Sequence, residues 1–135
     1  MRIACVEVGR WVPVVVGVIF LAGCGGDRTH ESRQNMHQLQ KAMLAYAEKH
    51  KDEWPERLDQ IKDEVGGASV FAKLMKNPLT GDDPGYEYVR PKGRHSDPGF
   101  HASQQVILYQ LRGGNRDTSL KVGYADGSVR ALGSK

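Results

Sequence analysis

Hydrophobic and polar positions alternate along residues 29–50 with the period of an amphipathic helix. Charged and amide side chains, among them Gln38, Gln40 and Lys41, fill the positions between apolar ones. The apolar or aromatic positions recur at spacings of three and four: Met36, Leu39, Met43, Tyr46, Ala47 and His50. This spacing places them on one helix face. The pattern predicts a helix from about Thr29 to His50 whose Met and Tyr stripe is core.

A second, shorter helix is predicted after the first. Pro55 suits a first helical turn, and Gly66 and Gly67 are typical terminators. Between them, three apolar residues form an i, i+3, i+7 face: Leu58, Ile61 and Val65. Trp54, at the junction, is expected to pack between the two helices. The apolar pattern continues until Asn77–Pro78, where it stops.

Beyond these helices the periodicity changes to that of strands. Four runs rich in β-branched and aromatic residues follow one another, at 86–90, 105–112, 120–125 and 128–132. Asp126–Gly127 separates the last two runs and is a strong hairpin signal, because both residue types tolerate positive φ. The sequence therefore predicts an α+β fold, in which a long N-terminal helix and a short second helix pack on a small antiparallel sheet of three or four strands.

The first 23 residues have the order of an export signal. Arg2 and Arg10 precede an uncharged apolar block at residues 11–20, and small residues follow the block. The 13 residues from Trp11 to Gly23 are too few to cross a bilayer, which takes about 20 apolar residues. The next positions, Leu21, Ala22, Gly23 and Cys24, resemble the bacterial lipobox. The resemblance implies cleavage before Cys24 and attachment of acyl chains to its sulfur.

Lipidation would divide the chain into three parts. These are a signal peptide at 1–23, a lipidated cysteine and tether at 24–30, and a globular domain at 31–135. Several acyl chains on one residue give a stable membrane anchor, whereas a single chain does not. In lipoprotein sorting, an Asp directly after the lipidated cysteine resembles a signal for retention in the inner membrane. This chain has Gly25 at that position, so we expect an outer-membrane address in the cell envelope, facing the periplasm. The alternative is an ordinary secretory signal in which Cys24 is incidental.

Composition narrows the classes of partner. The 135 residues carry a formal charge of +3, with both signs interspersed and no basic run that would follow a phosphate backbone, so we expect no nucleic-acid partner. Both cysteines, Cys5 and Cys24, lie in the first 24 residues. A domain that begins after them has no disulfide and depends on packing alone.

Two stretches resemble the globular part of type IV pilin-like proteins, especially the type II secretion major pseudopilin. One is NMHQLQKAMLAYAEKHKDEWPERL at 35–58; the other combines Asn77–Pro78 and PGYEYV at 84–89 with YADGSVR at 124–130. The latter is similar to the ending of prepilin-type proteins named for an H-x9-DG motif, of which Asp126 and Gly127 match the DG. The resemblance implies a pilin-like head and secretion or pilus components as partners.

The chain departs from that family at two points. The residue ten positions before Asp126 is Arg116, where the family has His. In addition, the long apolar segment with a Glu that anchors a prepilin and forms the filament core has no counterpart, and the lipobox stands in its place. We therefore expect a pilin-like head on a lipid tether rather than a filament subunit.

Few residues are candidates for chemistry. Asp82, Asp83 and Asp126 carry oxygen ligands of the kind that calcium prefers, although Asp is equally typical of turns. His95 and His101, with Asp97 between them, are interpreted as solvated loop residues rather than zinc ligands. No Gly-x-Ser-x-Gly, His-Glu-x-x-His or phosphate-binding glycine motif occurs, so we expect no enzyme activity and no cofactor, with calcium as the exception to test.

Two hypotheses follow for the function. The first is a lipid-anchored envelope protein with a structural or interaction role, accessory to a type II secretion or pilus-type system, which holds membrane lipid through acylated Cys24. The alternative is a periplasmic module that binds a small ligand, a glycan or calcium on the loops at 77–104, because loops on a rigid scaffold commonly carry binding sites. A hydrolase with an unrecognised site is disfavoured.

Overall fold

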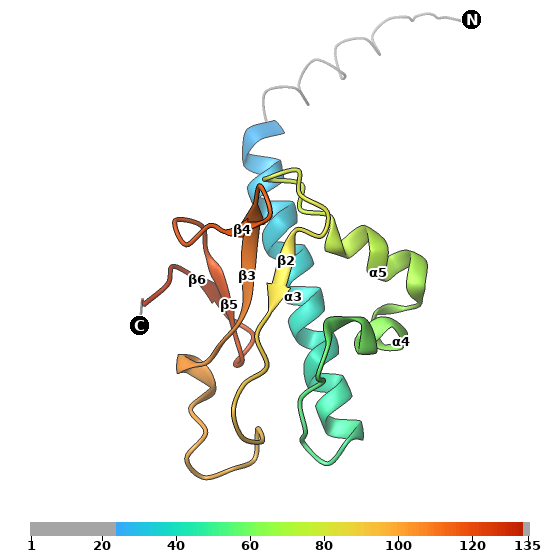
Figure 1. Ribbon diagram of the computed structural model, residues 1–135, viewed down its shortest axis with the longest axis vertical. Helices are drawn as coiled ribbons and strands as arrows, with labels where there is room; N and C mark the ends of the chain where they lie inside the picture. Colours follow the sequence, from blue (N-terminus) through green and yellow to red (C-terminus); the bar gives the residue numbers. More distant parts are fainter. Residues whose placement is uncertain (1–23, 134–135) are drawn as a thin grey trace, which may run out of the picture. The chain divides into compact units, whose positions relative to one another are not determined.

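A computed structural model describes residues 24–133 of the chain (Figure 1). The described residues from Glu31 onward form one compact unit. Helices come first in the order and strands follow: α3 (Cys24–Lys49), η1 (Leu58–Ile61), α4 (Lys62–Val65), α5 (Ala68–Met75), β2 (Tyr86–Tyr88), η2 (Ala102–Gln104), β3 (Val106–Arg112), β4 (Asn115–Arg116), β5 (Val122–Tyr124) and β6 (Val129–Arg130). The predicted α+β class, with a long helix on a small antiparallel sheet, is confirmed.

The predicted stripe of α3 faces the core over most of its length. Met36, Leu39 and Met43 are fully buried, whereas Tyr46 is half-buried. The last predicted member, His50, is exposed and stacks on Tyr46 with 3.8 Å between ring centroids. The helix also begins at Cys24, five residues before the predicted start. Gly25 and Gly26 are part of this helix. Glycine is tolerated there because it lowers helix stability by only about 1 kcal/mol per residue.

The second predicted helix is present in two parts. Its first turn is the 3-10 helix η1, and it continues as α4 until Gly66. Gly66 has a φ of 110° and so takes the left-handed conformation that ends many helices. The apolar pattern then continues in a third helix, α5, which is separate from α4 because Gly67 also has positive φ.

The sheet is antiparallel with the order β2-β3-β5-β6, and β4 pairs with the far end of β3. Within residues 24–133 it therefore has five strands rather than the three or four predicted. Periodicity missed β4 because this strand has two residues, both polar and exposed, after a turn at Gly113–Gly114. In Figure 1 the sheet lies on one side of α3, and α4 and α5 lie on the other.

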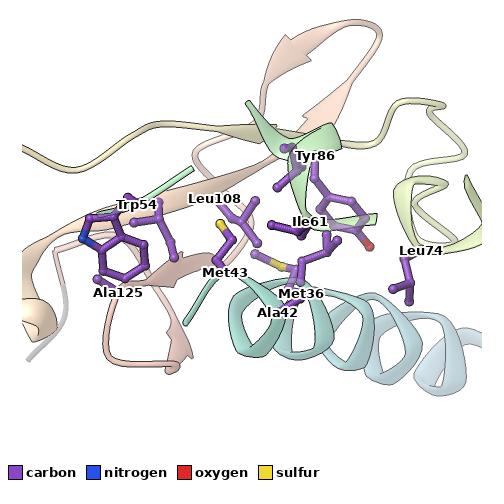
Figure 2. Close-up of a cluster of buried hydrophobic side chains, with 12 residues drawn as sticks. Met36, Ala42, Met43, Trp54, Ile61, Leu74, Tyr86, Leu108 and Ala125 are labelled. Carbon is purple, nitrogen blue, oxygen red and sulfur yellow. The ribbon is translucent and has the colours of Figure 1, made fainter. Parts of the chain in front are cut away.

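The core lies where α3 meets the sheet and the short helices. Its members come from all three: Met36, Leu39, Ala42, Met43, Trp54, Leu58, Ile61, Leu74, Tyr86, Ile107, Leu108 and Ala125. Figure 2 shows how Met36 and Met43 of α3 lie toward Leu108 of β3. Trp54 is buried among them, and its ring also meets those of His95 and Phe100, at about 6 Å between centroids. The loop that connects β2 to β3 is thereby packed against the core.

A buried polar cluster joins α3 to the sheet beside this core. The Gln110 Oε1 atom on β3 accepts hydrogen bonds from Ser32 Oγ at 2.8 Å and Asn77 Nδ2 at 3.0 Å. Gln110 Nε2 donates to the carbonyl of Lys121, and Ser32 Oγ also lies 3.0 Å from the Tyr86 hydroxyl. Burial raises the pKa of Tyr86, so this hydroxyl remains protonated at neutral pH. The cluster thus ties α3, the loop at Asn77, β2, β3 and the segment before β5 to one another.

Candidate functional site

The predicted lipidation site lies at the edge of the described structure. Leu21, Ala22 and Gly23, with the rest of the predicted signal peptide, lie outside the described residues. Cys24 is the first residue of α3. Of the helices in residues 24–133, none has the length and apolar character needed to span a bilayer.

The Asp126–Gly127 segment forms the predicted hairpin between β5 and β6. Its loop has three residues, since Tyr124 N donates to Ser128 O at 2.9 Å and Gly127 N donates to Tyr124 O at 3.0 Å. Gly127 alone of the pair has positive φ, which fits a three-residue loop that ends in a left-handed glycine. Asp126 tolerates positive φ but does not take it in this hairpin.

Asp126 stabilises this hairpin through its carboxylate. The Oδ1 atom accepts hydrogen bonds from Ser128 N at 2.9 Å and Ser128 Oγ at 2.6 Å. Partial burial acts to raise the pKa of Asp126, but the bonds from Ser128 and the charge of Arg130 outweigh it and lower the pKa. Asp126 therefore has the turn role that was the alternative to calcium binding.

Two residues of α3 hold the hairpin against the helix, and the sequence did not single out either of them. His37 Nδ1 lies 3.0 Å from the Gly127 carbonyl oxygen, and Gln40 Nε2 donates to the carbonyls of Tyr124 and Ser128 at 2.8 and 3.0 Å. Gln40 is buried, which contradicts its placement among the polar positions between the stripe. His37 and Gln40 are three positions apart and therefore lie on the same face of α3. This spacing is the sequence signal that could have identified the pair.

Arg116, ten positions before Asp126, links strands of the sheet. Its Nε donates to Glu87 Oε1 at 2.7 Å, and its guanidinium lies 4.3 Å from the Tyr109 ring centroid. The hydrogen bond from Arg116 lowers the pKa of Glu87. Arg116 thus links β4 to β2 and β3, whereas Asp126 bonds to residues of its own hairpin.

The other calcium candidates also lie in a turn. Asp82 accepts hydrogen bonds from the backbone nitrogens of Gly113 and Gly114, at 3.1 and 2.8 Å, and so joins the loop before β2 to the β3–β4 turn. Asp83 is the next residue in that loop. Within residues 24–133, no group of three or more His, Cys, Asp or Glu side chains has an arrangement that could hold a metal ion.

The two loop histidines have different surroundings. Both are exposed, but His95 packs with Trp54 and Phe100, and its backbone nitrogen donates to Asp52 O at 3.4 Å. Asp97 accepts from the backbone nitrogen of Arg94 at 2.8 Å, which closes a turn. The loop is therefore ordered by aromatic packing and turn hydrogen bonds.

An open groove lies between this loop and the segment that follows α3. It has a volume of about 640 Å³, and we call it the cationic groove, defined by Glu53, Trp54, Arg90, Lys92 and Arg94. Two contacts across it fix its walls, from Arg90 Nε to Trp54 O at 3.1 Å and from Arg94 Nη2 to Glu53 Oε2 at 2.9 Å. The volume is in the range of small-molecule sites.

In comparisons with known proteins, no family model, curated protein or solved structure matches this chain.

Proposed function

We propose that this chain is a lipid-anchored envelope protein whose pseudopilin-like head has a structural or interaction role, as an accessory to a type II secretion or pilus-type system. The observation that carries the proposal is the order Leu-Ala-Gly-Cys at the end of a short apolar block, directly ahead of the helix that packs on the sheet. Acyl chains on Cys24 would anchor the head at the outer membrane, facing the periplasm.

Two features of the described head support an interaction role: the use of its polar side chains within the fold, and the packing of a long helix on an antiparallel sheet. Among residues 24–133, the buried side chains of Ser32, Asn77 and Gln110 bond to one another and tie α3, a loop and the sheet together, and the described histidines and carboxylates form no metal cluster. A long helix on an antiparallel sheet is also the arrangement that the pilin resemblance implies. Function then depends on surface contacts with another protein.

Purification of the tagged chain from cross-linked, detergent-solubilised membranes tests the partner. We expect a component of a secretion or pilus-type system to be recovered with the tagged chain and to be absent when the same membranes carry an untagged chain. A soluble form that begins at Gly25, exported by a signal without a lipobox, is the matched control for anchoring. Recovery of no such component with either form contradicts the interaction role.

A small-ligand binding module is the second candidate, because the cationic groove offers charged groups and a fixed frame. Ligand that binds only the folded state raises the melting temperature. We expect calcium to leave the melting temperature unchanged, since Asp82 and Asp126 already accept hydrogen bonds in turns. A calcium-dependent rise would overturn that expectation.

A further inference from the structure

The cationic groove combines a concentration of positive charge with a frame that holds it in place. Arg90, Lys92 and Arg94 fall within five residues, and Glu53 is the only carboxylate among the residues that line the groove. Three cations and one carboxylate leave a net charge of +2. The groove therefore attracts anions, and its two Arg side chains offer the planar donors that suit oxyanions.

The groove is rigid at its base. Pro91 is buried, and the segment before it is held by the hydrogen bond from Val89 N to Ile107 O at 2.9 Å. On the opposite wall, Trp54 is 2% exposed and its carbonyl accepts from Arg90. Because the two walls are joined before any ligand arrives, little conformational entropy is lost on binding.

We infer that the cationic groove binds a phosphomonoester, with Lys92 and Arg94 on its phosphate. A phosphomonoester carries a charge of about −1.5 to −2 at neutral pH, which balances the net charge of the groove, whereas a single carboxylate balances only half of it. This inference goes beyond the proposed function and does not depend on lipidation or on a protein partner.

Tryptophan fluorescence gives a direct measurement. The chain has two tryptophans, Trp11 and Trp54, and the first lies in the predicted signal peptide, so in the processed chain emission comes from the groove alone. We expect a saturable change when the processed chain, purified in detergent, is titrated with glycerol 3-phosphate at constant ionic strength, and none with sodium chloride. In the Trp54→Phe variant this change should be lost, which shows that the signal comes from Trp54.

Two variants with the same change in charge test the assignment. Lys92→Gln removes a cation of the groove, and Lys121→Gln removes an exposed lysine outside its lining. We expect the affinity for glycerol 3-phosphate to fall about tenfold in Lys92→Gln, through loss of one charge-assisted hydrogen bond, and to stay within about twofold in Lys121→Gln. Equal losses in both variants would mean general charge attraction and would overturn the site.

The phosphomonoester could be soluble or the headgroup of a lipid, and nanodiscs separate these sources. If a soluble ester is the ligand, glycerol 3-phosphate saturates the change without lipid. If the headgroup is the ligand, the change needs nanodiscs that contain phosphatidic acid, is absent with phosphatidylcholine alone, and is weakened by Lys92→Gln. A chain that responds to neither probe, at millimolar glycerol 3-phosphate or with phosphatidic acid, has no such site.

Discussion

Gly85 shows how closely the loop before β2 approaches the end of α5. Its backbone nitrogen donates to Met75 O at 2.6 Å, and its carbonyl accepts from Leu111 N at 2.9 Å. A Cβ added at Gly85 would lie 2.3 Å from Asn77 Cβ and 2.6 Å from Asn77 N. Because the obstacle is backbone, no rotation of a side chain can relieve the clash.

We therefore predict that Gly85→Ala lowers the free energy of unfolding by about 3 kcal/mol, the upper part of the range for overpacked positions. Urea denaturation of the purified chain measures this change. Gly99→Ala is the matched control, because nothing lies within 4 Å of a Cβ at Gly99. Similar stability of the two variants would show that the loop adjusts freely.

Gln110 is the second residue on which the account depends. Replacing it by methionine keeps the size of the side chain but leaves the donors of Ser32 and Asn77, and the carbonyl of Lys121, without their present partner. We predict a loss of about 3 kcal/mol in the free energy of unfolding. Gln104→Met, at an exposed position, should change it by less than about 0.5 kcal/mol. Comparable losses in a thermal or urea melt would argue against the polar cluster.

Such residues mark the limit of sequence reasoning at this scale. Met36, Leu39 and Met43 were predicted to be buried because helical periodicity identifies an apolar face. Gln40 and Gln110 are just as buried, yet an amide carries no periodic signal. Their burial depends on partners 84 or 78 residues away in the chain, which one sequence does not reveal.

At the scale of elements, the β5–β6 hairpin couples stability to pH. Ser128 bonds and the charge of Arg130 favour ionised Asp126 in the folded chain, and its pKa is lower than in the unfolded chain. The unfolded state then binds more protons in acid, so the stability from Asp126 is present above the unfolded pKa, about 3.9, and is lost as pH falls through the folded pKa.

We predict that the melting temperature of the wild-type chain falls as pH is lowered from 5 to 2.5, and that Asp126→Asn makes this fall shallower. Asparagine keeps an oxygen acceptor for Ser128 and is common in turns, so the hairpin is retained. Asp117, whose pKa is lowered by Ser119 and Arg112, still contributes in the variant. If the melting temperatures of both proteins fall equally between pH 5 and 2.5, Asp126 does not couple stability to pH.

The elements themselves were predictable where local patterns are strong. The helical stripe, the Gly66 terminator and the Asp126–Gly127 hairpin each depend on residues close in sequence, and all three are present. The two-residue β4 has no periodicity to detect, and Asp82 accepts hydrogen bonds from the turn at Gly113–Gly114 that precedes it. That contact spans 31 residues and only the folded structure displays it.

At the scale of the whole molecule, one candidate site depends on residues close in sequence and the other depends on residues far apart. The lipobox is four adjacent residues, so sequence alone suffices to propose lipidation of Cys24. The cationic groove joins Glu53 and Trp54 to Arg90 and Arg94 across 36 to 41 residues, and no motif marks it. The loops at 77–104 were predicted as a place for ligands, but the sequence did not indicate that Glu53 and Trp54 form the opposite wall of the groove.

The intact mass of the chain purified from bacterial membranes tests the central claim, that acyl chains on Cys24 anchor a small α+β head. The account predicts a mass equal to residues 24–135 plus acyl chains, and the same mass for Cys5→Ala, because Cys5 lies in the segment removed. Cys24→Ala should carry no acyl chain. A wild-type mass that retains residues 1–23, or that shows an unmodified Cys24 at the start of the chain, would contradict the account.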